Sequence, residues 1–247
     1  ILSNIVIYLG QLIDQCINLN EKFLVDVFRI LTNFAKTEIG VEIISEHPLI
    51  SEYFQKVKDK DQIIASDNLL IEILARLTNP IRFLEKIDGF HFILDGLQSN
   101  DQTIVIKSLL ICQTISENKY GIEFMLNHNI VNLLFALTDS QFAISQIAFN
   151  VMCNIVSEGP PAAIPSFLES GLLGKLLSFM GNTTADVNLM NTILRAIQTI
   201  TLFTKETGNV ELIADMIPEL YEALEGFNAN KELGAIAIYI QEQLGEL

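Results

Sequence analysis

A repeat with a period of about 40 residues is the feature that most constrains what this chain can fold into. The stretch GIEFMLNHNIV at 121–131 repeats the pattern of GVEIISEHPLI at 40–50, which lies 81 positions earlier. A glycine, a glutamate, a histidine and the apolar positions coincide in the two stretches. Such self-similarity is typical of repeat proteins, in which each copy buries its apolar face against the next. The matched pairs are Gly40 and Gly121, Glu42 and Glu123, and His47 and His128.

Two further series of markers keep the same period. A turn residue followed by an apolar residue recurs at intervals of 41, 40, 42 and 44 positions. These pairs are Pro48–Leu49, Gly89–Phe90, Asn129–Ile130, Gly171–Leu172 and Asp215–Met216. Short polar loops alternate with them, at 18–21, 58–61, 98–101, 139–141, 181–184 and 226–230. The chain is therefore expected to consist of successive units of similar design.

The spacing of apolar residues between these markers predicts helices. Apolar residues recur at i, i+3, i+4 and i+7, and the alternation expected of strands is absent. In residues 104–115, for example, Ile111 and Cys112 lie on an apolar stripe of the predicted helix, and Lys107 lies outside this stripe. Each unit reads as a short, a medium and a long helix. In one unit these are predicted at 119–127, 130–138 and 141–157.

Capping residues and prolines support the predicted helix boundaries. Polar N-cap candidates stand just before the long helices, at Asp61, Asp101, Ser140 and Thr184. A proline inside a helix costs about 3 kcal/mol. All six prolines fall at predicted turns or first helical turns, namely Pro48, Pro80, Pro160, Pro161, Pro165 and Pro218.

The three-helix unit of about 42 residues resembles the armadillo repeat, with the looser HEAT repeat as its near neighbour. The resemblance covers the whole chain and implies an all-α, right-handed superhelical solenoid forming a single repeat domain. Because the sequence starts with Ile1 instead of Met, we expect a fragment of a longer chain. The units are predicted near 1–36, 38–78, 80–118, 119–158, 160–205 and 208–247.

Composition excludes several classes of function. Half of the residues are hydrophobic and 18% are charged, which excludes a disordered polyelectrolyte. No apolar run reaches the length of about 18 residues that a transmembrane helix needs. The net charge of −15 disfavours binding to nucleic acid or to an anionic membrane. Residues 205–247 carry nine acids and two bases, so a basic patch on a partner protein is the expected complement.

The cysteines indicate a reducing compartment. Cys16, Cys112 and Cys153 are widely spaced, odd in number and set in apolar helical sequence. This pattern favours buried, reduced thiols over a disulfide framework or a metal site. We therefore expect a cytoplasmic or nuclear protein.

The resemblance also implies a binding surface. In armadillo proteins the long third helices line a concave groove, where an Asn on each helix can hold the backbone of an extended peptide. The segments ILTNFAK around Asn33 and VMCNIVS around Asn154 resemble that pattern. Alternatively, these two residues only cap or bridge neighbouring helices. Equivalent and preceding positions add Arg29, Glu72, Arg76, Thr114, Asn150, Arg195 and Thr199, with Asp26, Asn68, Lys107, Leu110, Gln146 and Asn191 beside them.

One departure from the family narrows the expected partner. Nuclear-import receptors carry Trp ahead of the Asn, and this chain has no Trp. A neutral hydrogen bond contributes about 1 kcal/mol, whereas ordering each peptide residue costs about 1 to 2 kcal/mol. We therefore expect a folded partner, or a peptide with strong side-chain anchors, and not a nuclear localisation signal.

No motif in the sequence indicates a catalytic, metal or cofactor site. A nucleophile elbow, a phosphate-binding glycine loop and an HExxH motif are all absent. His47 and His128 are interpreted as turn residues that bond local backbone carbonyls. A cluster of acids near the C-terminus is interpreted as a solvated helix face or as a secondary docking patch. Its members are Glu211, Asp215, Glu219, Glu222 and Glu225.

These observations predict a non-catalytic scaffold that binds another protein, without a cofactor or a small-molecule substrate. By resemblance, an assembly chaperone of the proteasome regulatory-particle type and a small-GTPase regulator are alternatives. A passive spacer or dimerisation segment is another. A hydrolase within a helical scaffold is a further alternative, and it would require a deep pocket holding a carboxylate or histidine with a strongly shifted pKa.

Overall fold

A computed structural model of the chain describes residues 11, 23–182 and 186–246. Within these ranges the regular structure is helical and contains no strand. The chain divides into two compact units, residues 1–130 and 131–247. The predicted loop at 18–21, the N-cap at Thr184 and the thiol of Cys16 lie outside the described residues. The repeat boundaries and the single repeat domain stay predictions.

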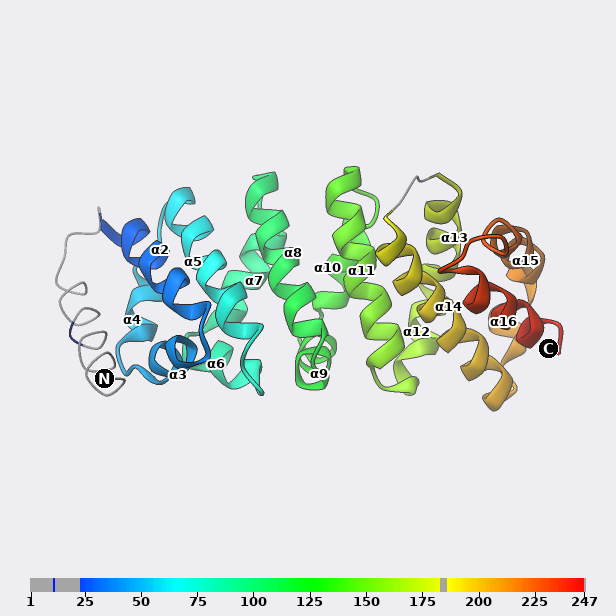
Figure 1. The fold of residues 1–247 in the computed structure, drawn as a ribbon, viewed down its shortest axis with the longest axis horizontal. Helices are drawn as coiled ribbons and strands as arrows, with labels where there is room; N and C mark the ends of the chain where they lie inside the picture. The colour runs from blue at the N-terminus through cyan, green and yellow to red at the C-terminus, as the bar shows by residue number, and fades with distance from the viewer. Residues whose placement is uncertain (1–10, 12–22, 183–185, 247) are drawn as a thin grey trace. The chain divides into compact units, whose positions relative to one another are not determined.

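Two shorter helices precede each of the long helices α5 and α8 of the first unit (Figure 1), but α3, with 9 residues, is longer than α4, with 6, so the predicted short and medium order is wrong there. The described part begins with the long helix α2, and two complete triplets follow before α9. Their bounds are α2 Leu24–Ala35, α3 Glu38–Glu46, α4 Ile50–Gln55, α5 Lys60–Leu74, α6 Pro80–Lys86, α7 Gly89–Leu97, α8 Gln102–Ser116 and α9 Lys119–Asn127.

In the second unit long helices again follow shorter ones, but the helices are less regular. Short 3-10 turns precede α12 and α15, where prolines occupy the first helical turn. The bounds are α10 Ile130–Leu137, α11 Phe142–Glu158, η2 Pro161–Ala163, α12 Ile164–Glu169, α13 Leu172–Asn182, α14 Val187–Thr207, η3 Val210–Leu212, η4 Ala214–Met216, α15 Ile217–Glu225 and α16 Gly234–Leu244. The predicted helices at 119–127, 130–138 and 141–157 thus correspond to α9, α10 and α11.

The predicted N-caps were partly wrong. Asp101 caps α8 as predicted, because its carboxylate accepts from the backbone N–H of Thr103 at 2.9 Å. At α5 the cap is Asp59 and not Asp61, since Asp59 and Gln62 form a reciprocal capping box. Asp61 lies inside the first turn of that helix.

Two other long helices begin later than predicted. The N–H of Ser140 bonds the carbonyl of Leu137, so Ser140 belongs to the turn that ends α10. Helix α11 follows Gln141, whose side chain makes no capping bond. Helix α14 is capped by Asp186, which accepts from the N–H of Asn188 at 3.1 Å.

The repeated glycine of the sequence has a structural cause. Gly40 and Gly121 lie in the first turn of α3 and α9, directly against the end of the preceding long helix. A Cβ on Gly40 would lie 2.0 Å from the Phe34 carbonyl oxygen, and one on Gly121 would lie 2.0 Å from the Ile115 carbonyl oxygen. Only glycine permits this approach of two backbones.

Apolar side chains fill the space between the helices of each unit. In the first unit Phe28 of α2 packs on Phe54 of α4, with ring centroids 5.4 Å apart, and Phe54 packs edge-on to Phe83 at 6.4 Å. In the second unit Phe149 of α11 packs on Phe179 of α13 at 4.6 Å. Each such side chain, when fully buried, contributes about 1.5 to 3 kcal/mol.

The cysteines in the described ranges are buried, free thiols, as predicted. Cys112 and Cys153 have no exposed surface. Burial away from water raises the pKa of both thiols, that of Cys112 to about 12. Because the thiolate is the reactive form, these cysteines act as small apolar core residues.

Polar contacts in the first unit join positions one sequence period apart. Lys86 donates to the carbonyl of Ser45 at 2.6 Å, and Asn118 donates to that of Thr78 at 3.0 Å. These partners are 41 and 40 residues apart along the chain. In the second unit Lys175 donates to Asp139 at 2.5 Å, but these residues are 36 positions apart and do not follow the period.

The two turn histidines differ from each other. The ring of His128 contacts the carbonyl oxygen of Phe124 through Nδ1 at 2.8 Å, as predicted. In His47 the Nδ1 accepts from the backbone N–H of Leu49 at 3.3 Å. The carbonyl bond predicted for His47 stays a prediction.

Candidate functional site

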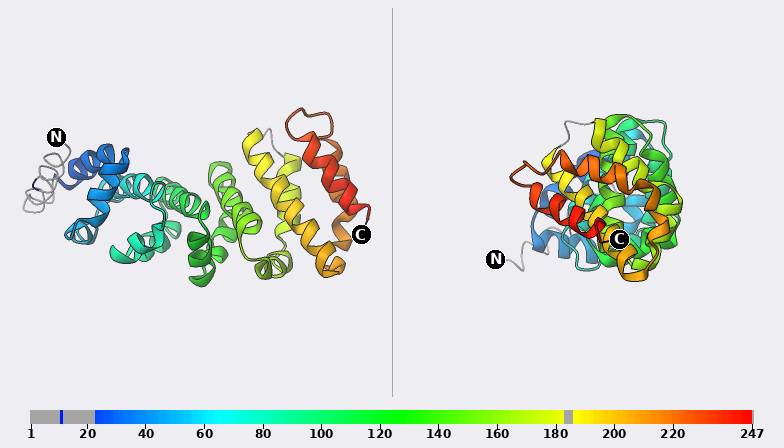
Figure 2. Two further views of the ribbon diagram at one scale, coloured as in Figure 1. Left: turned by 60° about the horizontal axis from the view of Figure 1, so that its bottom comes forward. Right: turned by 90° about the vertical axis from the view of Figure 1, so that its right-hand side faces the viewer.

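The long helices lie side by side within each unit. In the first unit α5 packs between α2 and α8, and in the second α14 packs between α11 and α16. Figure 1 and the left view of Figure 2 show these neighbours next to one another. Their outward faces carry the polar residues for which a groove was predicted.

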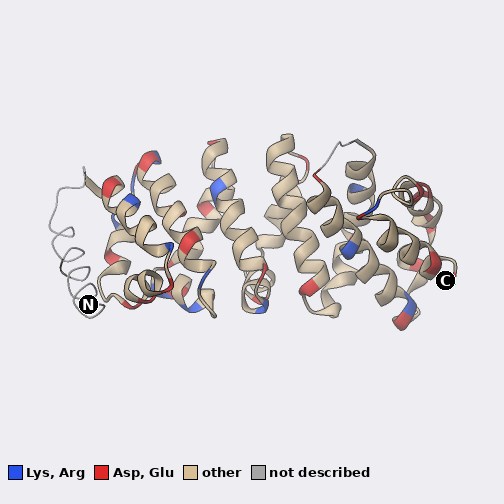
Figure 3. Ribbon diagram, viewed as in Figure 1, with Lys and Arg blue, Asp and Glu red and all other residues tan. Residues whose placement is uncertain are grey.

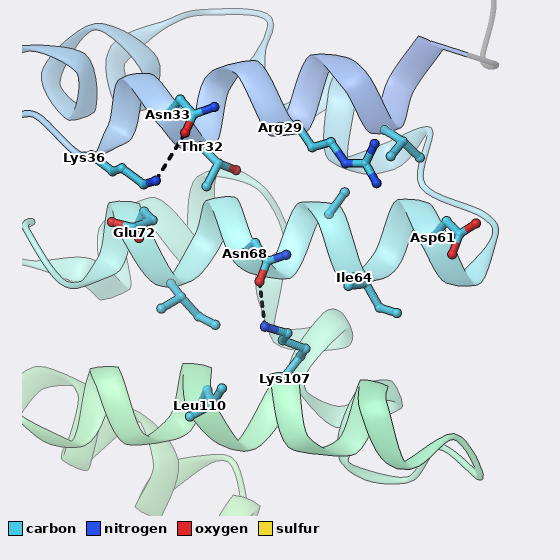
Figure 4. Close-up of a pocket in the computed structure, with 13 residues that line it drawn as sticks. Arg29, Thr32, Asn33, Lys36, Asp61, Ile64, Asn68, Glu72, Lys107 and Leu110 are labelled. Atoms are coloured by element: carbon cyan, nitrogen blue, oxygen red, sulfur yellow. Dashed lines mark hydrogen bonds between the residues drawn. The ribbon is translucent and has the colours of Figure 1, made fainter.

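In the first unit these faces form a hollow of about 560 Å³ between α2, α5 and α8 (Figure 4). We call it the groove hollow. It brings together three of the predicted residues, Arg29, Asn33 and Glu72. Its other lining residues are Val25, Thr32, Lys36, Asp61, Ile64, Ala65, Asn68, Ile71, Lys107 and Leu110.

Lysines engage both asparagines of the groove hollow. Lys36 donates to Oδ1 of Asn33 at 3.2 Å, one turn along α2. Lys107 of α8 donates to Oδ1 of Asn68 on α5 at 2.7 Å, and both side chains are visible in Figure 4. The acceptor oxygens are therefore occupied by cations. Each amide still has its nitrogen, with two N–H donors.

Two of the three arginines of the predicted groove are paired with acids three or four residues earlier in the sequence. Arg29 lies 3.5 Å from Asp26, and both side chains are mostly exposed. Arg76, just after the end of α5, bonds the carboxylate of Glu72 at 2.7 Å. Arg76 does not line the groove hollow and instead faces a separate hollow beside α3.

Thr114 also lies outside the groove hollow. Its hydroxyl donates to the carbonyl of Leu110 on the same helix at 2.9 Å. Thr199 of the second unit bonds the Arg195 carbonyl in the same way at 3.0 Å. Both hydroxyls are thus used within their own helices, and each can still accept from a ligand.

The second unit forms its own hollow of about 610 Å³ between α11, α14 and α16. Arg195 and Thr199, both predicted, line it together with Asn191. Asn150 and Asn154 lie half-buried on α11 and are not among its lining residues. The remaining lining residues are Ser157, Glu158, Gln198, Glu232, Ala235 and Ile236.

The predicted acidic cluster is a solvent-exposed surface. All five of its carboxylates are exposed, two in the 3-10 turns η3 and η4 and three on α15. Figure 3 shows the acids gathered around α15. Apolar residues of α15, Leu220 and Leu224, face inward and are buried. This is the pattern of an amphipathic surface helix with a negatively charged outer face.

A buried carboxylate that the sequence reasoning missed lies beneath the groove hollow. Asp67 of α5 is 2% exposed, and its Oδ2 has no hydrogen-bond partner. Burial raises the pKa of Asp67 to about 7, although the Lys107 ammonium lowers it in part. Asp67 lines none of the hollows above, so its shifted pKa does not mark the deep pocket that the hydrolase alternative requires.

Sequence reasoning also missed Lys36 and Thr32 as groove residues. Both lie within one turn of Asn33, and Lys36 follows it at i+3, the spacing at which helical side chains meet. Among the described residues no group of three or more His, Cys, Asp or Glu side chains could hold a metal ion. None of the described helices has both the length and the apolar run needed to cross a membrane.

Comparison with known protein families and with curated proteins finds no match to this sequence. Solved structures do match. The designed armadillo repeat protein YIII(Dq)4CqI has a TM-score of 0.78 and 19% identity, covering 95% of this chain and 99% of that chain. YIII(Dq.V1)4CPAF, a designed armadillo repeat protein in complex with the peptide (KR)4, has a TM-score of 0.75 and 17% identity, covering 95% and 98%.

A crystal structure of computationally designed armadillo repeat proteins for modular peptide recognition also has a TM-score of 0.75, with 17% identity over 95% of this chain and 98% of that chain. At these identities the likeness concerns the fold. It agrees with the triplets of two shorter helices and one long helix, and with the contacts of the first unit between positions 40 and 41 residues apart. The chain has an all-α, armadillo-like repeat fold.

Proposed function

We propose that this protein is a non-catalytic scaffold that binds a partner protein along the polar faces of its long helices. The observation that carries the proposal is the groove hollow, in which Arg29, Asn33 and Glu72 from two helices converge with Asn68 and Lys107. An open hollow between neighbouring helix faces, lined by both polar and apolar side chains, suits a protein segment better than a small substrate, which needs an enclosing pocket.

The amide groups set the orientation of the bound segment. An Asn side chain has one acceptor oxygen and two donor hydrogens. Because Lys107 occupies the oxygen of Asn68, the amide nitrogen is the group that Asn68 offers to a ligand. It would donate to a main-chain carbonyl of the partner. Each such bond contributes about 1 kcal/mol, so the partner also needs side-chain anchors or a folded surface.

Charge favours a partner that carries basic residues. The chain has a net charge of −15, and the exposed acids of α15 form a secondary contact surface. The structurally similar protein YIII(Dq.V1)4CPAF was solved with the peptide (KR)4, which supports a basic ligand for this fold. Complementary charge would speed association and select among partners. We place the complex in the cytoplasm or nucleus, where free thiols such as Cys112 persist.

A capture experiment with matched variants tests this proposal. One variant replaces Arg29, Asn33, Lys36 and Arg195, each of which lines one of the two hollows, with Ala. The control replaces Arg82, Lys119, Lys231 and Asn228, which are exposed and do not line the groove hollow or the hollow of the second unit. Both variants remove three cations and one amide. We expect the first to lose at least tenfold in captured partner, measured by quantitative mass spectrometry, and the control to match the original chain.

The opposite results would reject the groove. Equal capture by the two variants would show that the partner does not contact these long-helix faces. Capture of a second copy of the same chain alone would support the dimerisation alternative instead. Circular dichroism of both variants would verify that the helices are retained.

A further inference from the structure

A second hollow of the first unit has a chemistry unlike that of the groove hollow. It has a volume of about 370 Å³ and lies between the end of α4, the helix α7 and the first turns of α5 and α8. We call it the apolar hollow. The two hollows share no residue. Ile63 of α5 lines the apolar hollow, and Ile64 of the same helix lines the groove hollow.

Hydrophobic side chains form the floor of the apolar hollow. Phe54 and Ile87 are fully buried there, and the half-buried ring of Phe92 stands edge-on to Phe54 with centroids 5.8 Å apart. Val57 and Ile63 are also half-buried, so apolar surface remains open to solvent. A concave apolar surface that stays open to solvent can receive an apolar side chain of a ligand.

A glycine shapes one wall of the hollow. Gly96 of α7 approaches α8 so closely that an added Cβ would lie 1.9 Å from the Oγ of Ser108. The absence of a side chain at Gly96 therefore lets α7 pack closely on α8 beside the hollow.

Carboxylates stand at the rim of this hollow. Asp88 and Asp95 are exposed, and both line it. Asp88 has a positive φ of 54° and pairs with His91 at 3.8 Å. The two carboxylates beside the apolar floor repel anionic ligands such as phosphates and fatty acids. It matches a ligand that places a cation next to a bulky apolar group.

We propose that the apolar hollow docks a partner protein segment in which one bulky apolar side chain is flanked by Lys or Arg. The apolar side chain would cover Phe92 and Ile63, and the flanking cations would reach Asp88 and Asp95. Apolar burial supplies most of the affinity, and the carboxylates supply the selection for basic neighbours.

Short peptides provide a direct test. The probe is the acetylated, amidated tripeptide Lys-Phe-Lys, added to the ¹⁵N-labelled chain and followed by NMR. We expect saturable shifts at the amides of Phe92, Gly96 and Ser99. Lys-Ala-Lys should bind at least about tenfold more weakly because it lacks the apolar ring. Glu-Phe-Glu should bind more weakly as well, because its charges oppose those of the rim.

Variants at the rim distinguish binding at this site from nonspecific electrostatic attraction to the chain. Asp88→Asn and Asp95→Asn should each weaken Lys-Phe-Lys binding about 1.5- to 5-fold, the range for exposed ion pairs. Asn tolerates the positive φ at position 88. Glu85→Gln serves as the control, because Glu85 is exposed in the same unit but does not line the hollow, and it should leave binding unchanged.

Several outcomes would overturn the proposal. One is the absence of shifts, and another is a set of shifts centred on Asn68 and Lys107 of the groove hollow. Equal binding of Glu-Phe-Glu would also overturn it. Sedimentation velocity would measure the oligomeric state of the chain and its variants. A dimer of the original chain that dissociates in Asp88→Asn or Asp95→Asn would overturn the proposal, because a second copy of the chain would then be the occupant.

Discussion

The two units share one helical plan but place their charged groups in different surroundings. In the first unit Asp67 is buried next to Lys107, which bonds Asn68 across to the neighbouring helix. In the second unit Lys175 of α13 bonds Asp139, which lies in the turn after α10, and the Asp139 side chain is 72% exposed. The first arrangement is shielded from water and the second is not.

This difference shows how a repeat fold can vary its electrostatics without changing its helices. Charges in a shielded site interact strongly and respond to pH, because desolvation disfavours the ionised form. Charges at an exposed position are screened by water and salt and contribute little. We therefore expect the first unit to respond more strongly than the second to the same kind of substitution.

The largest effect is expected from Asp67→Asn. The native pKa of about 7 lies above the ordinary value of 3.8, so between these values the native state holds a proton that the unfolded state has lost. Stability consequently falls as pH rises through this window and stays low above it. Removing the ionisable group should add up to about 4 kcal/mol to the free energy of unfolding at pH 8, and little at pH 4.

Urea unfolding at pH 4, 6 and 8 would measure this effect. The matched control is Asp139→Asn in the second unit, which removes an exposed carboxylate and should change stability by at most about 1 kcal/mol. If Asp67→Asn destabilised the chain at pH 8, Asp67 would be an ionised, stabilising partner of Lys107, and the contrast between the units would fail.

The next largest effect is expected from Gly121→Ala. The added Cβ would overlap the Ile115 carbonyl oxygen, which belongs to the backbone of α8 and cannot rotate away. Forcing α9 from α8 should cost about 3 kcal/mol. Thermal unfolding followed by circular dichroism would measure the loss, and Gly40→Ala should reproduce it. A melting temperature that stays unchanged in both variants would mean that this close approach is absent in solution.

Much of the fold could be predicted from the sequence because the repeat is written locally. The spacing of apolar residues and the turn pairs predicted α9 at its observed bounds, and α10 and α11 within one residue of theirs. Capping was harder, because several polar residues precede each helix. Asp59, and not Asp61, is the N-cap because Asp59 and Gln62 bond each other reciprocally. The sequence is compatible with this bond but does not specify it.

The site was predictable only in part, for a physical reason. Periodicity places Asn33, Glu72 and Arg29 on the outward faces of neighbouring helices, and they do line one hollow. It does not specify which side chains pair. Arg76 turned back to Glu72, and Lys107 reached Asn68 from the next repeat. Asp67 was missed because an acid within an apolar stripe has no signature of its own in the sequence.

An intermediate effect should follow from Lys107→Met. This change removes a charged hydrogen bond to Asn68 and the cation that lowers the pKa of Asp67. At pH 8 it should cost about 2 kcal/mol, since bonds to charged groups contribute about 1.5 to 3 kcal/mol. The pKa of Asp67 should rise further, which ¹³C NMR of the carboxylate would follow.

Lys175→Met is the matched change in the second unit. Lys175 bonds Asp139 and lies 4.6 Å from the centroid of the Phe135 ring. We expect a cost of about 0.5 to 1 kcal/mol, which salt should reduce further. Equal losses in the two variants would contradict the view that only the first unit shields its charges.

The smallest effect should be a gain, from Gly181→Ala in the second unit. Gly181 lies within α13, is exposed and has no atom within 4 Å of where a Cβ would stand. Alanine there reduces the freedom of the unfolded chain and should stabilise the protein by about 0.5 kcal/mol. Gly171→Ala should instead destabilise it, because Gly171 has a φ of 82° that alanine adopts only with strain. Chemical denaturation of both variants, alongside Gly121→Ala, would measure the free energy of unfolding. The comparison would show at which positions a steric clash of the Cβ or a positive φ prevents replacement of the glycine. A gain for Gly121→Ala as large as that for Gly181→Ala would remove the steric argument for the repeated glycine.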